Sequence, residues 1–299
     1  MKRLPRIAAL TGKQAIAIVR VVSGRAAALR RQFVALCGLT LIATAWAIAP
    51  AGKQPFVHVS AISAPSGIAA SGAKWIAIEN NAGRKFVAAV FRPEGRGPFP
   101  VVVALHGASG LQDRYLEVAA ELAHHGFLVV AGCWQAAKSP IPICAQATPE
   151  DEWVADPANN SGKELIAAVR YLPKARANRI ALYGMSRGGH AALWAAASGA
   201  RVRAVVVDGA AYRPVMLDPP RSTLETLRRI SVPVLLMHGT NDNVIPVGQA
   251  YEFERSARTM GKAVDAVYFE GGGHMVSVQS ETRKEAIQLA VAFLRKQLR

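Results

Sequence analysis

Residues 180–197 read IALYGMSRGGHAALWAAA. The apolar run that ends at Tyr183 predicts a buried strand, and the alanine-rich run that starts at Gly189 predicts a helix. Between them lies a G-x-S-x-G pentapeptide, which in this context forms a sharp turn that holds its serine above the sheet. Glycine is needed beside the serine because the turn leaves no room for side chains. The pattern predicts that Ser186 is a nucleophile, and a turn serine without chemistry is the alternative.

Apolar strands alternate with helical stretches along residues 73–299. This alternation is typical of βαβ units, and it predicts one α/β domain with a mostly parallel central sheet and helices on both faces. Two short inserts, 132–160 and 211–229, stand in place of a large cap. The predicted strands are 74–79, 85–91, 101–105, 127–131, 179–183, 202–207, 232–237 and 263–269. The predicted helices are 113–125, 162–172, 187–198, 223–229, 247–259 and 282–298.

Residues 1–49 differ from the rest of the chain in charge. They hold eight Lys and Arg and no acidic residue, and they end in an uncharged run, Phe33–Ala49. Such a segment is typical of a signal peptide, so we expect an exported protein, periplasmic or secreted. A retained membrane anchor is the second interpretation, because the run is just short of a spanning helix, and an organelle transit peptide is the third. Arg30 and Arg31 also resemble a twin-arginine signal.

Composition divides the remaining chain into a linker and a globular part. Residues 50–72 are rich in Ala, Pro, Ser and Gly, which is typical of a linker. The full chain has a net charge of +16, of which residues 1–49 contribute half. In the remainder, basic and acidic residues are interspersed without a basic helix stripe, so we expect no nucleic-acid partner. The excess charge indicates either a basic proteome or an attraction to anionic surfaces. We expect membrane contact only if the N-terminal segment is retained.

The chain has three cysteines. Cys37 lies in the apolar run and would leave with a cleaved signal. Cys133 and Cys144 flank a loop that contains proline, and a disulfide between them is one interpretation for an oxidising compartment. Two free, buried cysteines are the other, because the sequence does not give the separation of their Cα atoms.

Two further motifs follow Ser186, each directly after a predicted strand. Asp242 lies in the sequence HGTND, and His274 follows three glycines. A serine is a poor nucleophile until an imidazole takes its proton and a carboxylate orients that imidazole. The order Ser, Asp, His at the ends of successive strands therefore predicts a catalytic triad of Ser186, Asp242 and His274. Asp208, at the end of the preceding strand, is the alternative acid.

This arrangement over residues 73–299 resembles the α/β-hydrolase superfamily, and within it the dienelactone-hydrolase-like and prolyl-oligopeptidase-like esterases. In that superfamily the segment after the third strand supplies an amide of the oxyanion hole, and here it reads HGASG at residues 106–110. The resemblance therefore implies the Ala108 N–H as one donor and the Arg187 N–H as the other. Dienelactone hydrolases proper use a cysteine where this chain has Ser186. That departure shifts the expectation towards general ester hydrolysis.

These motifs lead us to expect a serine hydrolase that cleaves small-molecule carboxylic esters through an acyl-enzyme intermediate, without a cofactor. A serine peptidase or amidase on the same triad is the alternative, and a non-catalytic binding protein with the same fold is the third. No histidine or cysteine pair has metal-ligand spacing, so we expect no metal and interpret His106 and His238 as structural. Four large side chains of the inserts either line the pocket or pack beneath the loops: Trp134, Trp153, Tyr212 and Met216.

Overall fold

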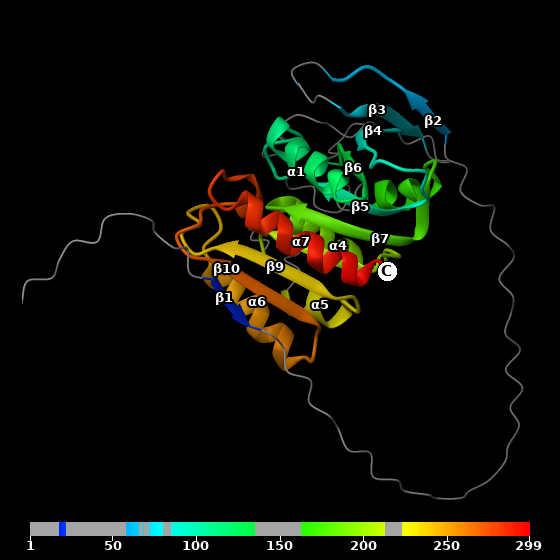
Figure 1. Cartoon of the computed structure of the whole chain (residues 1–299). Coiled ribbons are helices and arrows are strands. Elements are labelled where there is room, and N and C mark those ends of the chain that lie inside the picture. The colour runs from blue at the N-terminus through cyan, green and yellow to red at the C-terminus, as the bar shows by residue number, and fades with distance from the viewer. Residues whose placement is uncertain are drawn as a thin grey trace, which may run out of the picture.

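The computed structural model describes residues 18–21, 58–65, 68, 72–79, 85–134, 163–212 and 223–299. In this part of the chain, ten strands form one sheet in the order β1-β10-β9-β8-β7-β5-β6-β4-β3-β2. Helices cover both faces of the sheet (Figure 1). The strand order reverses at β5, since β6 lies on one side of it and β7 on the other. Doubly wound sheets bind their ligands at such a reversal, outside the carboxyl ends of the strands.

Six neighbouring strands are parallel, from β6 at one end to β10 at the other. They are β5 (Phe99–Leu105), β6 (Leu128–Gly132), β7 (Ala175–Met185), β8 (Ala204–Asp208), β9 (Val234–Gly239) and β10 (Val264–Phe269). The outer strands β1 (Ile18–Val21), β2 (His58–Ala61), β3 (Lys74–Glu79) and β4 (Lys85–Phe91) pair antiparallel. Because parallel strands end at one edge of the sheet, the segments that follow them meet there.

The helices lie in two layers. On one face lie α1 (Asp113–His124) and α7 (Arg283–Gln297), and on the other lie α4 (Arg187–Ala197), α5 (Thr223–Arg229) and α6 (Gly248–Thr259). Helical residues 163–168 continue into the short helix η1 (Val169–Tyr171), and η2 (Val276–Val278) follows β10. Alternate residues of β5 enter the two cores, with Val103 on one face and Val102 on the other. Since both faces are covered, the central strands are apolar throughout.

The predicted α/β fold is confirmed, and each strand and helix predicted from residue 74 onward has a counterpart. Two strands occur where none was predicted: β1 lies in the predicted export segment and β2 in the predicted linker. Residues 80–84, between the predicted strands 74–79 and 85–91, and most of both inserts lie outside the described residues. No helix in the described part is long and apolar enough to cross a membrane.

Cys133 is buried and disulfide-bonded. It is the single cysteine among the described residues, and Cys144, the predicted partner, lies outside them.

Candidate active site

Ser186 lies in a strained turn between β7 and α4. Its backbone has φ 53° and ψ −120°, a conformation that costs a residue with a side chain about 1–3 kcal/mol. The Ser186 N–H donates to the carbonyl of Asp208 on the neighbouring strand, at 2.9 Å. Glycine is required two residues later, because a Cβ atom on Gly188 would lie 2.0 Å from the carbonyl oxygen of Leu105. The local packing therefore holds the strained serine in place.

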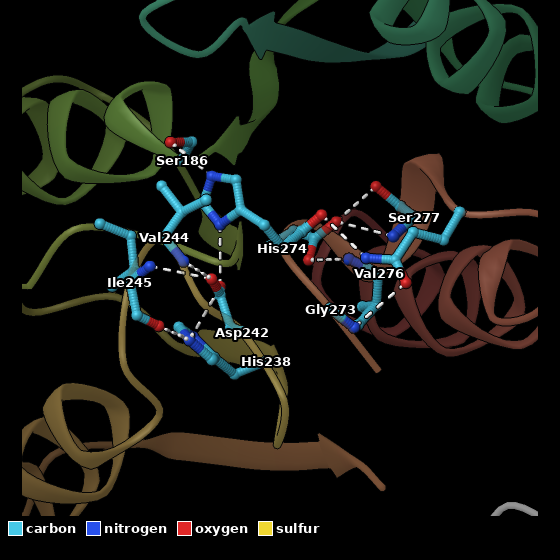
Figure 2. Close-up of polar contacts among 11 residues, drawn as sticks. Ser186, His238, Asp242, Val244, Ile245, Gly273, His274, Val276 and Ser277 are labelled. Atoms are coloured by element: carbon cyan, nitrogen blue, oxygen red, sulfur yellow. Dashed lines mark hydrogen bonds and ion pairs between the residues drawn. The ribbon is translucent and has the colours of Figure 1, made fainter. Parts of the chain in front are cut away.

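The structure brings Ser186, His274 and Asp242 together in one line of hydrogen bonds (Figure 2). The Oγ atom of Ser186 is 3.0 Å from Nε2 of His274, and Nδ1 of His274 is 2.8 Å from Oδ2 of Asp242. A carboxylate only accepts hydrogen bonds, so Nδ1 carries the imidazole hydrogen. Nε2 is then the acceptor that faces the serine hydroxyl. This is the geometry that a general base needs.

Asp242 is held as a carboxylate by the loop that follows β9. Its Oδ1 atom accepts hydrogen bonds from the backbone N–H groups of Val244 and Ile245, at 2.9 and 2.8 Å. Burial by itself would raise the pKa of Asp242, but hydrogen bonds from His238, His274 and Ile245 outweigh it and bring the pKa well below its ordinary value. The acid beside His274 therefore stays ionised at neutral pH.

His238 contacts Asp242 from the side opposite His274, as Figure 2 shows. Its side chain is fully buried, and Nε2 lies 2.8 Å from the carbonyl of Ile245 and 3.2 Å from Oδ2 of Asp242. Both of these are acceptors, so Nε2 carries the hydrogen. The sequence assigned His238 a structural role and missed this contact. The signal was present in the four-residue spacing of His238 and Asp242 around a tight turn.

Asp208, the alternative acid, has a different set of partners. Its buried carboxylate accepts hydrogen bonds from the N–H groups of Val276 and Ser277, both at 2.8 Å, and from the Ser277 hydroxyl. Burial raises the pKa of Asp208, and the bonds from Ser277 and Val276 oppose that shift. Asp208 thus anchors the segment that follows His274, while Asp242 is the acid at the imidazole.

The loop after β5 lies against the nucleophile. A Cβ atom on Gly107, the residue before Ala108, would lie 3.2 Å from Cβ of Ser186. Within the described residues, the Ala108 N–H donates to no backbone acceptor. Arg187 opens α4, so its N–H belongs to the first turn, where amides have no acceptor inside the helix. Arg187 therefore adjoins the nucleophile in the chain, and Ala108 follows a glycine that packs against it.

The insert residues that the structure describes are packed. Trp134 is fully buried, donates from its indole N–H to the carbonyl of His106 at 3.2 Å, and contacts the imidazole of His106. Tyr212 is buried against Phe253 and His238. For these two side chains, packing beneath the loops is the correct interpretation. Trp153 and Met216 lie outside the described residues.

The buried imidazole of His106 stays neutral. Burial lowers its pKa from 6.5 to about 4, against a smaller opposite effect of its bond to the carbonyl of Gly107. That bond fixes the hydrogen on Nδ1, at 2.9 Å from the carbonyl oxygen. His106 therefore supports the start of the Gly107 loop without adding a charge beside the site.

Comparison with protein families matches residues 86–295 to the dienelactone hydrolase family. The chain belongs to the dienelactone hydrolase family. The match covers the sheet from β4 onward and every residue of the predicted site. Comparison with curated protein sequences gives no match.

Solved structures resemble this dienelactone hydrolase family member in fold. The dienelactone hydrolase from Anabaena variabilis is 19% identical, with a TM-score of 0.55, over 82% of this chain and all of that one. A dienelactone hydrolase-like promiscuous phosphotriesterase from metagenomic libraries is 17% identical, with a TM-score of 0.63, over 76% and 98% of the two chains. The acylaminoacyl peptidase of Pyrococcus horikoshii is 16% identical, with a TM-score of 0.56, over 82% of this chain but 42% of that peptidase.

Proposed function

We propose that this dienelactone hydrolase family member is a serine esterase, which cleaves carboxylic esters through an acyl-enzyme intermediate. The observation that carries the proposal is the line of hydrogen bonds from Ser186 through His274 to Asp242, 3.0 and 2.8 Å long. The family is named for the hydrolysis of a lactone, a cyclic ester. From residues 1–49 we propose that the enzyme is exported, to the periplasm or the medium.

In the first half of the reaction, Oγ of Ser186 attacks the ester carbonyl carbon while Nε2 of His274 takes the hydroxyl proton. Asp242 keeps the imidazole oriented and stabilises the imidazolium. The imidazolium then gives its proton to the alcohol oxygen, the C–O bond breaks, and the acyl group stays on Ser186. Proton transfer by a positioned base of this kind contributes about 10²–10⁴ in rate.

In the second half, Nε2 takes a proton from a water molecule, and the resulting hydroxide attacks the acyl carbon. The bond to Oγ breaks, Ser186 regains its proton from the imidazolium, and the carboxylic acid leaves. Both halves pass through a tetrahedral oxyanion, for which we propose the N–H groups of Ala108 and Arg187 as donors. Loss of one such donor costs about 3–4 kcal/mol of activation free energy. We propose no cofactor, because each step uses protein groups and water.

A peptidase or amidase on the same three residues is the second candidate. The similarity in fold to the acylaminoacyl peptidase of Pyrococcus horikoshii favours it, although the chain spans 42% of that protein. The chemistry differs in the leaving group, since an amine must be protonated before the C–N bond breaks. Relative rates on an ester and an amide of the same acyl group therefore separate the two candidates.

The test is hydrolysis of p-nitrophenyl esters from acetate to palmitate, beside the matching p-nitroanilides. Ser186→Ala should lower kcat by about 10⁴–10⁶. Ser198→Ala, at the other end of α4, is the matched control and should keep the wild-type rate. Ester hydrolysis that survives in Ser186→Ala would reject the nucleophile. Faster anilide than ester cleavage would replace the esterase proposal with the peptidase candidate.

A further inference from the structure

The edge of the sheet opposite the candidate active site is basic. The parallel strands all start at this edge, and six positive charges within 34 residues lie before β7, in its first five residues, or before β8. We call this group the basic edge; its members are Arg170, Lys174, Arg176, Arg179, Arg201 and Arg203. No acidic residue occurs from Leu165 to Val207. The C-terminus lies at the same end of the molecule (Figure 1).

Three arginines of the basic edge, Arg170, Arg179 and Arg203, are held by carbonyl oxygens instead of carboxylates. Arg170 donates to the carbonyl of Ala177 at 2.7 Å and also to that of Arg201. Arg203 donates to Asn178 at 3.1 Å, and Arg179 donates to Leu298 at 2.9 Å.

Within the described residues, none of the six forms an ion pair, although four pairs of Lys or Arg with Glu exist elsewhere. A carbonyl fixes the position of a guanidinium without cancelling its charge. The basic edge therefore keeps its charge, and three of its guanidinium groups are fixed in position.

Two further observations mark this edge as a surface for an anionic partner. Burial lowers the pKa of Arg170, and the neighbouring positive charge of Arg201 lowers it further, so the cations are close enough to repel one another. Tyr171 lies beside Arg170 with 41% of its surface exposed. Exposed tyrosine next to Lys and Arg is the combination that proteins place at the headgroup level of membranes.

We propose that the basic edge docks on the surface of a bilayer that contains anionic lipids. The sequence favours a bilayer over other polyanions, since the apolar run Phe33–Ala49 brings the chain to a membrane whether it is an export signal or a retained anchor. Docking by the basic edge goes beyond the expectation from the sequence alone, because it does not require that the N-terminal segment is retained. Each Lys or Arg near an anionic bilayer strengthens binding about fivefold. A nucleic acid would be favoured by several exposed aromatic side chains, whereas Tyr171 is the one exposed aromatic at this edge in the described residues. Docking of the basic edge does not require the proposed esterase activity.

The test is sedimentation of the full chain with vesicles of phosphatidylglycerol and phosphatidylcholine, and with phosphatidylcholine alone. Lys174→Glu/Arg201→Glu removes two exposed charges whose side chains hold no element in place. Arg255→Glu/Lys284→Glu, on exposed positions of α6 and α7, is the control with the same net charge. We expect the first variant to bind anionic vesicles about 30-fold more weakly or worse. The control should bind like wild type, and 0.5 M NaCl should remove the difference.

Hydrogen exchange on the vesicle-bound full chain is the second measurement, because residues 1–49 can themselves bind vesicles. We expect anionic vesicles to slow exchange at residues 170–178 and 199–203, with no change at the start of α7. Equal binding by the two variants together with unchanged exchange at the basic edge would overturn the proposal. Tighter binding to single-stranded RNA than to vesicles, lost in Lys174→Glu/Arg201→Glu, would overturn it in favour of a nucleic acid.

Discussion

Replacement of His238 by leucine is expected to lower both stability and turnover, because one N–H group connects His238 to two acceptors. The bond from Nε2 to the Asp242 carboxylate, at 3.2 Å, is charge-assisted, and its loss costs about 1.5–3 kcal/mol. The carbonyl of Ile245, 2.8 Å from Nε2, also loses its donor, at a further cost of about 1 kcal/mol. A total of about 2.5–4 kcal/mol corresponds to a Tm about 10 °C lower in a domain of this size.

The variant should also have a lower kcat, because Asp242 loses its contact with His238 on the side opposite His274 and is no longer held in position. A shift of about 1 Å in a reacting group lowers kcat by about 100-fold. His238→Gln places an amide N–H near the position of Nε2 and should restore most of kcat. The assay is thermal unfolding together with kcat and KM on p-nitrophenyl acetate.

Glu254→Ala is the control for stability alone, since Glu254 binds Tyr268 and Arg258 away from the site. It should lower Tm without lowering kcat at 25 °C. Two results would exclude this role of His238: wild-type kcat in His238→Leu, or equal losses of kcat in the glutamine and leucine variants. The second result would assign the effect to packing instead of the N–H group.

Three more predictions concern single groups. Because the pKa of His106 is lowered from 6.5 to about 4, the free energy of unfolding should be about 3 kcal/mol higher above pH 6.5 than at about pH 4. In urea unfolding at several pH values, His106→Gln should weaken this pH dependence of stability. The same pH dependence in His106→Gln and wild type would contradict the prediction. Ser186→Gly should relieve the backbone at φ 53° and raise stability by about 1 kcal/mol over Ser186→Ala, and equal Tm values would exclude strain. A reductant should lower the free energy of unfolding of the wild type by about 2–4 kcal/mol, because it breaks the disulfide of Cys133. The same reductant should leave the stability of Cys133→Ser unchanged.

The sequence predicted the sheet, and it also predicted which three side chains would meet at one edge of that sheet, because each motif lies at a strand end. Ser186, Asp242 and His274 lie 88 residues apart at most, yet the order of their strands is sufficient to bring them to one edge. Parallel strands make this inference reliable, since every carboxyl end faces the same way.

The start of β7 and the role of His238 were not predictable in the same way. β7 begins at Ala175 instead of Arg179, because Ala175 pairs with Phe99 and because Arg170 and Arg203 donate to the carbonyls of Ala177 and Asn178. A polar run held by distant arginines has no strand periodicity of its own. Similarly, a buried histidine at a strand end has the same sequence signature whether or not it contacts a neighbouring acid, as His106 and His238 show.

Asp208 bonds to both sides of the candidate site without entering the proposed reaction. Its carbonyl accepts from the N–H of Ser186, and its carboxylate accepts from Val276 and Ser277 just after His274. Asp208, at the end of β8, thus fixes the distance between the nucleophile Ser186 and the base His274. An engineer who varies the loops around Asp242 or the inserts to change selectivity can therefore expect the gap between Ser186 and His274 to persist. Replacement of Asp208 itself would act first on the distance between Ser186 and His274, and only through that distance on the choice of substrate.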